Sequence, residues 1–197
     1  MNTDITIRRA RLADAAVLAD LRLVTWRETY PVILPEPVLT AMSAERQRVR
    51  LAESIESASP DIAVFCAVAD SRLVAYGICG PARGGPKGFG GEVQELYVLS
   101  DFYGQGIGRA MMARMAMWLA SRGYNALFAA VLQQNHAARA FYRRLGGERC
   151  GEAKIVMGGK ELLQEAFGWR DLAVLTGSPT DDTGRLYPIL RRPDEDD

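Results

Sequence analysis

A glycine-rich turn between a short strand and a long helix constrains this chain more than any other stretch. Leu96–Leu99 are β-type residues, Gly104, Gly106 and Gly108 follow, and Met and Ala residues then recur at helical spacing. The first N–H groups of a helix lack intrahelical partners, and the helix dipole places positive potential there. Glycine also lets the backbone approach a ligand closely. The stretch therefore predicts an anion cradle suited to phosphate.

Two common phosphate-binding loops do not fit this turn. A P-loop needs Lys followed by Ser or Thr after its last glycine, whereas Arg109 and Ala110 follow Gly108 here. A dinucleotide fingerprint needs Gly-x-Gly-x-x-Gly, and the glycines here have a different spacing. A ligand-free glycine turn ahead of a core helix stays open as an alternative.

A strand that leads into Gly-x-Gly-x-Gly and a helix resembles the acetyl-CoA pyrophosphate loop of the GNAT family of N-acetyltransferases. A second motif of that family has Asn, then Ala three residues on, Tyr seven residues on, and then Gly. Asn135, Ala138, Tyr142 and Gly146 occupy those places. The two motifs occur in the family's order, separated by one helix and one strand, so the chain resembles the GNAT family in two independent places.

The order of the patterns predicts an α/β fold, β-α-α-β-β-β-α-β-α-β-β, around one sheet. The resemblance implies a GNAT-like mixed, mostly antiparallel sheet with helices on both faces. The strand that begins near Glu92 and the apolar strand Ala126–Leu132 should be parallel, joined by a right-handed crossover. Two hairpins are expected, one turning at Asp70–Arg72 and one at Gly158-Gly159.

Composition narrows the class of protein. The chain has 197 residues, of which 48% are hydrophobic, and this suits one domain with a full core. Lys and Arg number 24 and so do Asp and Glu, which gives no general attraction to nucleic acid. Three cysteines without CxxC spacing argue against a disulfide framework or a zinc site. With no signal-peptide pattern and no apolar run of membrane-spanning length, we expect a cytoplasmic protein with no nucleic-acid or membrane partner.

The resemblance implies transfer of an acetyl group from acetyl-CoA, the acyl-donor substrate, to an amine, without a metal. The backbone of the glycine turn should hold the pyrophosphate, and the strand before it should pair with the amide-rich pantetheine arm. The family's loop usually begins with Arg or Gln, whereas this chain has Tyr103 in that place. The expected cofactor-binding residues are Leu96, Tyr97, Val98, Gly104, Gln105, Gly106, Ile107, Gly108, Arg109 and Asn135.

We expect two catalytic residues. Tyr142 is a neutral donor at pH 7 and is placed to protonate the departing thiolate. Glu92 matches a position where family members carry a base, acting directly or through water. Strand alternation puts Glu95 on the opposite face, and Glu95 is the alternative base. The single histidine, His136, is at a helix start and is expected to be an exposed turn residue.

The amine acceptor is a small molecule or a peptide, and no motif identifies it. Trp26 and Tyr30 end the first predicted helix, a region that commonly borders the acceptor pocket in the family. Simple packing of Trp26 on the sheet is the alternative. A different functional class, a non-catalytic acyl-CoA-binding sensor or scaffold, needs the glycine turn but needs neither Glu92 nor Tyr142. A nucleotide-binding module is a more distant candidate.

The resemblance runs from about Ile5 to about Leu175. We therefore expect an N-acetyltransferase domain over residues 1–175 and a C-terminal extension over residues 176–197. The extension contains the apolar segment Leu186–Leu190, and free disordered tails seldom carry such a segment. It should either fold back onto its own sheet or cross to a second subunit, and we predict a homodimer.

Overall fold

A seven-stranded sheet forms the centre of the molecule, in the order β1-β2-β3-β4-β5-β7-β6. The computed structural model describes residues 5–57 and 59–177. Within these residues only β4 and β5 pair in parallel, so the sheet is mixed and mostly antiparallel, as predicted. The strands are β1 (Ile5–Arg9), β2 (Ala63–Ala69), β3 (Arg72–Pro81), β4 (Gly91–Val98), β5 (Leu127–Leu132), β6 (Glu148–Met157) and β7 (Lys160–Trp169).

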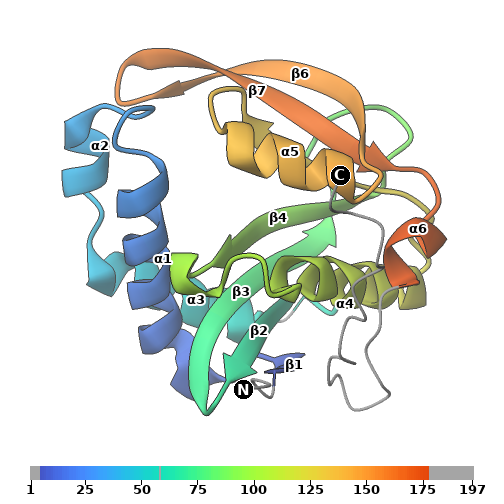
Figure 1. The fold of residues 1–197 in the computed structure, drawn as a ribbon, viewed down its shortest axis with the longest axis horizontal. Helices are drawn as coiled ribbons and strands as arrows, with labels where there is room; N and C mark the ends of the chain where they lie inside the picture. Colours follow the sequence, from blue (N-terminus) through green and yellow to red (C-terminus); the bar gives the residue numbers. More distant parts are fainter. Residues whose placement is uncertain (1–4, 58, 178–197) are drawn as a thin grey trace, which may run out of the picture.

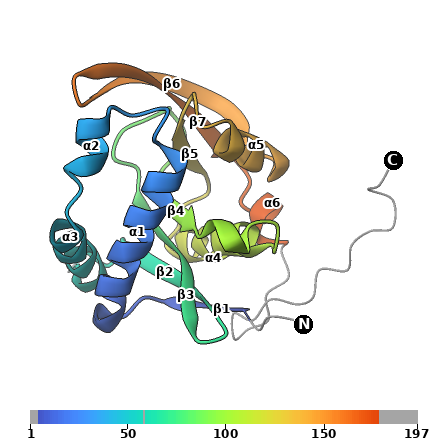
Figure 2. The same ribbon diagram turned by 60° about the vertical axis from the view of Figure 1, so that its left-hand side comes forward.

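The helices cover both faces of this sheet, which confirms the predicted layers. α1 and α3 lie on one side of β2, β3 and β4, and α4 lies on the other (Figures 1 and 2). Met111, Met112 and Met115 of α4 are fully buried against the sheet. The helices are α1 (Ala15–Thr29), α2 (Glu36–Thr40), α3 (Ala44–Glu56), α4 (Ile107–Ser121), α5 (His136–Arg144) and α6 (Ala173–Thr176).

Local side-chain chemistry fixes several of these boundaries. The Ser43 side chain accepts a hydrogen bond from the Arg46 N–H at the start of α3, and the Asn135 side chain accepts one from the Ala138 N–H at the start of α5. The short helix α2 was not among the predicted elements, which placed two helices between the first and second strands. Pro37 lies in the first turn of α2, where a missing N–H costs nothing.

β4 and β5 separate soon after they meet, and this separation positions the site. They pair only over Gly91–Val93 and Leu127–Ala129. Beyond this point β4 continues beside β3 as far as Val98, whereas β5 continues beside β7 as far as Leu132. The facing edges of the two strands are therefore left open in the middle of the sheet.

A β-bulge in β4 changes which residues share a face. The register pairs Glu95 with Ile78 and Glu92 with Gly80, which leaves Gln94 as the extra residue. Since Ile78 and Gly80 are two residues apart, they lie on the same face of β3, and their partners do too. The prediction that Glu92 and Glu95 face opposite sides is therefore wrong.

The hairpin of β6 and β7 extends across the molecule to α2 (Figure 1). Its turn is Gly158-Gly159, as predicted, with φ values of +57° and +77°. The Lys160 ammonium donates a hydrogen bond to the Ile33 carbonyl oxygen over 3.0 Å, and a Cβ added to Gly158 would lie 2.3 Å from Val38 Cγ2. The tip of the hairpin thus packs against the segment that follows α1.

Two further sequence-based expectations concern the C-terminal extension and membrane-spanning helices. The apolar segment Leu186–Leu190, which led to the homodimer prediction, lies outside the described residues. Within the described residues, none of the helices has both the length and the apolar character needed to cross a bilayer.

Candidate active site

A cavity of about 1370 Å³ opens where β4 and β5 separate. Ligand pockets usually measure roughly 300–1,000 Å³, so this cavity has room for a long ligand and a second one beside it. It has two walls. The glycine-loop wall consists of the lining residues from β4, residues 100–109 and residues 130–145, and the α1–hairpin wall consists of those from α1, residues 30–34, β6 and β7. Every predicted site residue lines the cavity except Glu92 and Gln105.

The glycine turn brings backbone N–H groups to the glycine-loop wall. Gly104 and Gly106 have φ values of +75° and +78°, in the left-handed region that favours glycine, and Gly106 is the N-cap of α4. Gly108 has a different reason to be glycine, since a Cβ there would lie 3.0 Å from the Phe141 ring on α5. The side chain of Gln105 does not line the cavity, and it donates a hydrogen bond to the Asp101 carbonyl oxygen.

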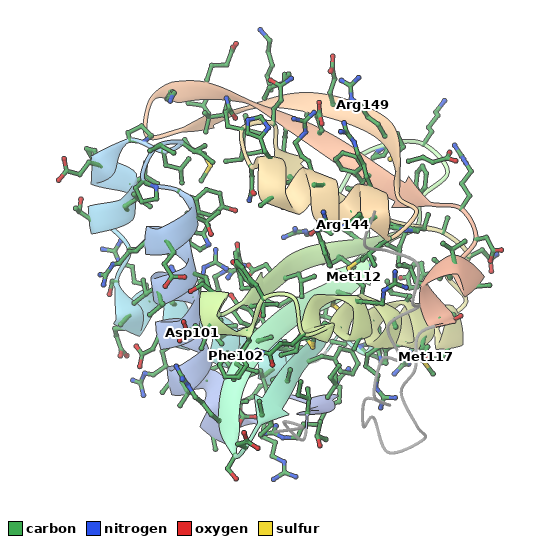
Figure 3. All side chains as sticks on the ribbon, viewed as in Figure 1. Asp101, Phe102, Met112, Met117, Arg144 and Arg149 are labelled. Carbon is green, nitrogen blue, oxygen red and sulfur yellow. The ribbon has the colours of Figure 1, made fainter. Side chains whose placement is uncertain are left out.

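Two exposed arginines add positive charge beside this turn. Arg109 belongs to the first turn of α4, and Arg144 lies at the end of α5 (Figure 3). Both line the cavity. Together with the free N–H groups at the start of α4, they make this part of the cavity favourable for an anion. The sequence analysis missed Arg144, because nothing in its spacing connects it to a loop 35 residues earlier.

Tyr142 is buried at the back of the glycine-loop wall. Only 7% of it is exposed, and its ring packs against Phe167 and Trp169 with centroid distances of 6.1 Å and 5.9 Å. Burial raises the pKa of Tyr142 well above its usual range. The phenol therefore stays protonated at neutral pH and can donate a proton or a hydrogen bond into the cavity.

Glu95 lines the cavity, but its carboxylate already has three donors. Arg22 and Arg50 form ion pairs with it, and the Tyr76 hydroxyl donates a hydrogen bond over 2.7 Å. Burial by itself would raise the pKa of Glu95, but the charges and hydrogen bonds of the two arginines outweigh it and lower the pKa. Glu95 is consequently a weak proton acceptor that holds its neighbours in place.

Glu92 is buried on the same face of β4 and does not line the cavity. Its carboxylate accepts hydrogen bonds from the Arg83 backbone N–H over 2.9 Å and from the Arg83 guanidinium over 2.8 Å. The Arg83 side chain is 57% exposed, so this pair reaches the surface on one side. Arg83 therefore holds the Glu92 carboxylate through both its backbone and its side chain.

The α1–hairpin wall begins with two aromatic rings. Trp26 and Tyr30 lie with their centroids 4.9 Å apart, and the Arg22 guanidinium lies 5.0 Å from the Trp26 ring. Burial raises the pKa of Tyr30. Both rings line the cavity.

The other residues of the α1–hairpin wall were not predicted from the sequence to line a site. Ile33 and Leu34 follow α1, whereas Ile155, Met157 and Gln164 come from the β6–β7 hairpin. The alternation of Ile155 and Met157 could have marked one face of a strand, but it does not say which segment that face meets.

Tyr103 and His136, which the sequence also singled out, both line the cavity. Tyr103, which replaces the Arg or Gln of the resembled loop, lines the cavity and is 60% exposed. His136 also lines it, is exposed at the start of α5, and has its Nδ1 3.3 Å from an Arg139 nitrogen. Within residues 5–57 and 59–177, no group of three or more His, Cys, Asp or Glu side chains could hold a metal ion.

Comparisons with known proteins agree with this geometry. The model of the acetyltransferase (GNAT) family matches residues 22–147. YuaI, an uncharacterized N-acetyltransferase of Bacillus subtilis, is 31% identical over 174 residues, which cover 87% of this chain and 96% of YuaI. The crystal structure of ribosomal-protein-alanine N-acetyltransferase from Brucella melitensis is 28% identical with a TM-score of 0.64, over 83% of this chain and 98% of that one.

A more distant structure carries a ligand. The PaiA N-acetyltransferase from Thermoplasma acidophilum, in complex with coenzyme A, has a TM-score of 0.63 over 84% of this chain and 98% of that one. Its sequence is 20% identical, so the likeness shows a shared fold.

Proposed function

Because the chain belongs to the acetyltransferase (GNAT) family, we propose that it transfers an acetyl group from acetyl-CoA to a primary amine of a small molecule or peptide by direct attack. The observation that carries this proposal is one cavity whose wall includes both an anion-binding glycine turn and a protonated, buried phenol. The wall across from them has room for a second ligand. The chain is thus proposed to be an acyl-CoA-dependent N-acyltransferase.

Acetyl-CoA would lie along the glycine-loop wall. The N–H groups between Gly104 and Arg109 suit the pyrophosphate, with Arg144 as a second cation. The edge of β4 at Leu96–Val98 that faces away from β3 suits the amide groups of the pantetheine arm, because the pairing of β4 with β5 ends at Val93. Structural neighbours of this fold have been crystallised with coenzyme A and with acetyl-CoA, which supports the same ligand here.

Tyr142 is proposed as the general acid. The amine nitrogen attacks the thioester carbonyl carbon, the carbon–sulfur bond breaks, and the phenol of Tyr142 donates a proton to the departing sulfur. A phenol is protonated at neutral pH, so Tyr142 carries the proton that this step needs. No covalent acyl-enzyme is needed, because positioning two bound reactants supplies much of the rate increase.

Glu92 is retained as the proposed proton acceptor, acting through water. Glu95 is nearer to the cavity, but its two arginines lower its pKa and occupy its oxygens. Glu92 shares the face of Glu95 and is held by one partly exposed arginine. Comparing Glu92→Gln with Glu95→Gln tests this choice. Glu92→Gln should lose activity most at low pH, where the amine most needs deprotonating. If Glu95→Gln shows this loss and Glu92→Gln does not, Glu95 is the proton acceptor.

An acceptor screen tests the function itself. The protein would be incubated with acetyl-CoA and a panel of amines, and release of the free thiol would be followed. Thiol release that depends on one amine supports the transferase. Tight acetyl-CoA binding with no thiol release from any amine would instead favour the non-catalytic sensor or scaffold.

The cellular setting is part of the proposal. Cys66 and Cys79 are buried free thiols and Cys150 is a partly buried one, which fits a reducing cytoplasm. A homodimer is proposed from the apolar segment Leu186–Leu190 of the sequence. Light scattering on the full chain and on a chain that ends at Gly184 measures the dimer and the contribution of that segment.

A further inference from the structure

We propose that the acceptor is an apolar primary amine, one that carries an aromatic or branched aliphatic group and no carboxylate. This inference rests on the proposed function and concerns the α1–hairpin wall of the same cavity. Eleven lining residues make up that wall, and seven of them are hydrophobic. Such a wall lowers the free energy of a bound apolar group by removing its surface from water.

Charge is nearly absent from this wall. Glu28, which is exposed, is the one charged residue among the described residues that line it. The arginines that line the cavity, Arg109 and Arg144, both belong to the glycine-loop wall. A polyamine or an aminoglycoside would bring several positive charges to a wall that offers one carboxylate.

The cation behind this wall is already paired. Arg22 is 9% exposed, forms an ion pair with Glu95, and does not line the cavity. Its guanidinium lies between two rings, 5.0 Å from that of Trp26 and 5.5 Å from that of Tyr97. An amino-acid acceptor would therefore lose the hydration of its carboxylate without gaining a counter-ion, and this loss opposes binding.

The side chains packed behind the wall also suit an apolar group. The hairpin tip is held to the segment after α1 by the Lys160–Ile33 hydrogen bond, and Ile33, Leu34, Leu132 and Leu162 form a buried cluster beneath it. Trp26 and Tyr30 stand beside this cluster with their rings tilted by 57°. Aromatic rings prefer edge-to-face or offset contacts with one another, so an aromatic ligand can pack favourably against either ring of this pair.

The experiment compares amines that share a skeleton. Phenethylamine and isoamylamine carry the apolar group alone, phenylalanine adds a carboxylate to the first, and spermidine replaces the apolar group with further charges. We expect kcat/KM for phenethylamine to exceed that for phenylalanine and spermidine by about a hundredfold, since an unpaired buried charge is costly. Equal or higher kcat/KM for phenylalanine or spermidine would overturn the inference.

A pair of variants assigns the effect to the wall. Met157→Arg places a cation in the α1–hairpin wall and should lower kcat/KM for phenethylamine about tenfold while raising it for phenylalanine. Met117→Arg is the matched control, because Met117 is 43% exposed on α4 and does not line the cavity (Figure 3). The same change of preference in both variants would exclude this wall as its origin.

Binding separates this inference from the proposed function. The melting temperature of the CoA-bound protein should rise with phenethylamine and not with phenylalanine. If that difference in melting temperature appears without any thiol release, the result supports the apolar acceptor site and contradicts the proposed transferase activity. If spermidine is acetylated best, the result supports the transferase activity and contradicts the apolar acceptor site. A CoA-bound protein that phenethylamine does not stabilise, and that does not acetylate it, would also overturn the apolar site.

Discussion

The two walls of the cavity are assembled in different ways. The glycine-loop wall comes from two short stretches of the chain, within residues 93–109 and 130–145, and it presents backbone N–H groups and a few polar side chains. The α1–hairpin wall joins segments that are far apart, since Ile33 and Lys160 are 127 residues from each other. The first wall follows from local spacing, whereas the second exists only after the hairpin has packed against α2. Substitutions in the two walls should therefore change different measured quantities.

The largest effect is expected at the glycine turn. Gly108→Asp places a negative charge at the start of α4 and should weaken coenzyme A binding by about a hundredfold or more, because the site favours anions. Calorimetry measures the affinity. Gly108→Ala is the control, since its Cβ meets the Phe141 ring at the same 3.0 Å without adding charge. If Gly108→Ala weakens binding as much as Gly108→Asp, packing against Phe141 is responsible and the anion site is not.

The next effect is on the reaction rate. Tyr142→Phe removes the proposed acid and should lower turnover by about ten- to a thousandfold, within or just below the usual range for general acid catalysis. Coenzyme A affinity should stay nearly unchanged, because the ring still packs against Phe167 and Trp169. Steady-state kinetics measures the turnover, and calorimetry measures the coenzyme A affinity. Tyr124→Phe is the control, because Tyr124 does not line the cavity. If Tyr142→Phe turns over as fast as wild type, water and not Tyr142 protonates the thiolate.

A smaller effect should appear only at the α1–hairpin wall. Gly158→Ala brings a Cβ to 2.3 Å from Val38 Cγ2 and should push the hairpin tip away from α2, which raises KM for the acceptor about tenfold through lost apolar contacts. Gly159→Ala is the matched control, since it has a similar positive φ and meets no atom within 4 Å. Coenzyme A affinity should not change in either variant. A loss of coenzyme A binding in Gly158→Ala would mean that the two walls are not independent.

The smallest effect concerns stability in acid. The pKa of Glu95 is lowered in the folded protein, so its ion pairs contribute fully above the ordinary glutamate pKa and are lost as pH falls through the lowered value. Glu95→Gln should be less stable than wild type at pH 7, and its free energy of unfolding should fall less between pH 6 and pH 3. Urea unfolding across this range measures both. Glu53→Gln, an exposed position on α3, serves as control and should follow wild type.

Local chemistry explains what the sequence could predict. The Asp70-Ser71 hairpin turn, the Gly158-Gly159 turn and the Asn135 cap each depend on neighbours within a few residues. The strand and helix order and the glycine turn are local patterns too. Local patterns were therefore enough for the α/β element order and for the anion-binding turn, whereas the mixed sheet and the other residues of the glycine-loop wall were implied by the resemblance to the GNAT family.

Non-local packing explains what the sequence could not predict. The bulge at Gln94 has no glycine or proline to mark it, and it reversed the expected facing of Glu92 relative to Glu95. The partners of those carboxylates, Arg83, Arg22 and Arg50, come from other elements. In the sequence, Ile155 and Met157 have the pattern of ordinary strand residues. They line the cavity only because the hairpin packs against α2. Each of these features arises from contacts between distant segments.

We expect the two parts of the sheet on either side of the short β4–β5 pairing to open as separate units. Three residue pairs join β1–β4 to β5–β7–β6 along the backbone, and α4 packs across both. Hydrogen exchange on the ligand-free protein should give the two units separate opening free energies. A ligand that fills the gap stabilises the state in which both are closed, in proportion to the logarithm of its concentration. Saturating coenzyme A should therefore merge the two opening free energies into one, so that the local acyl-CoA level sets how long the protein survives proteolysis.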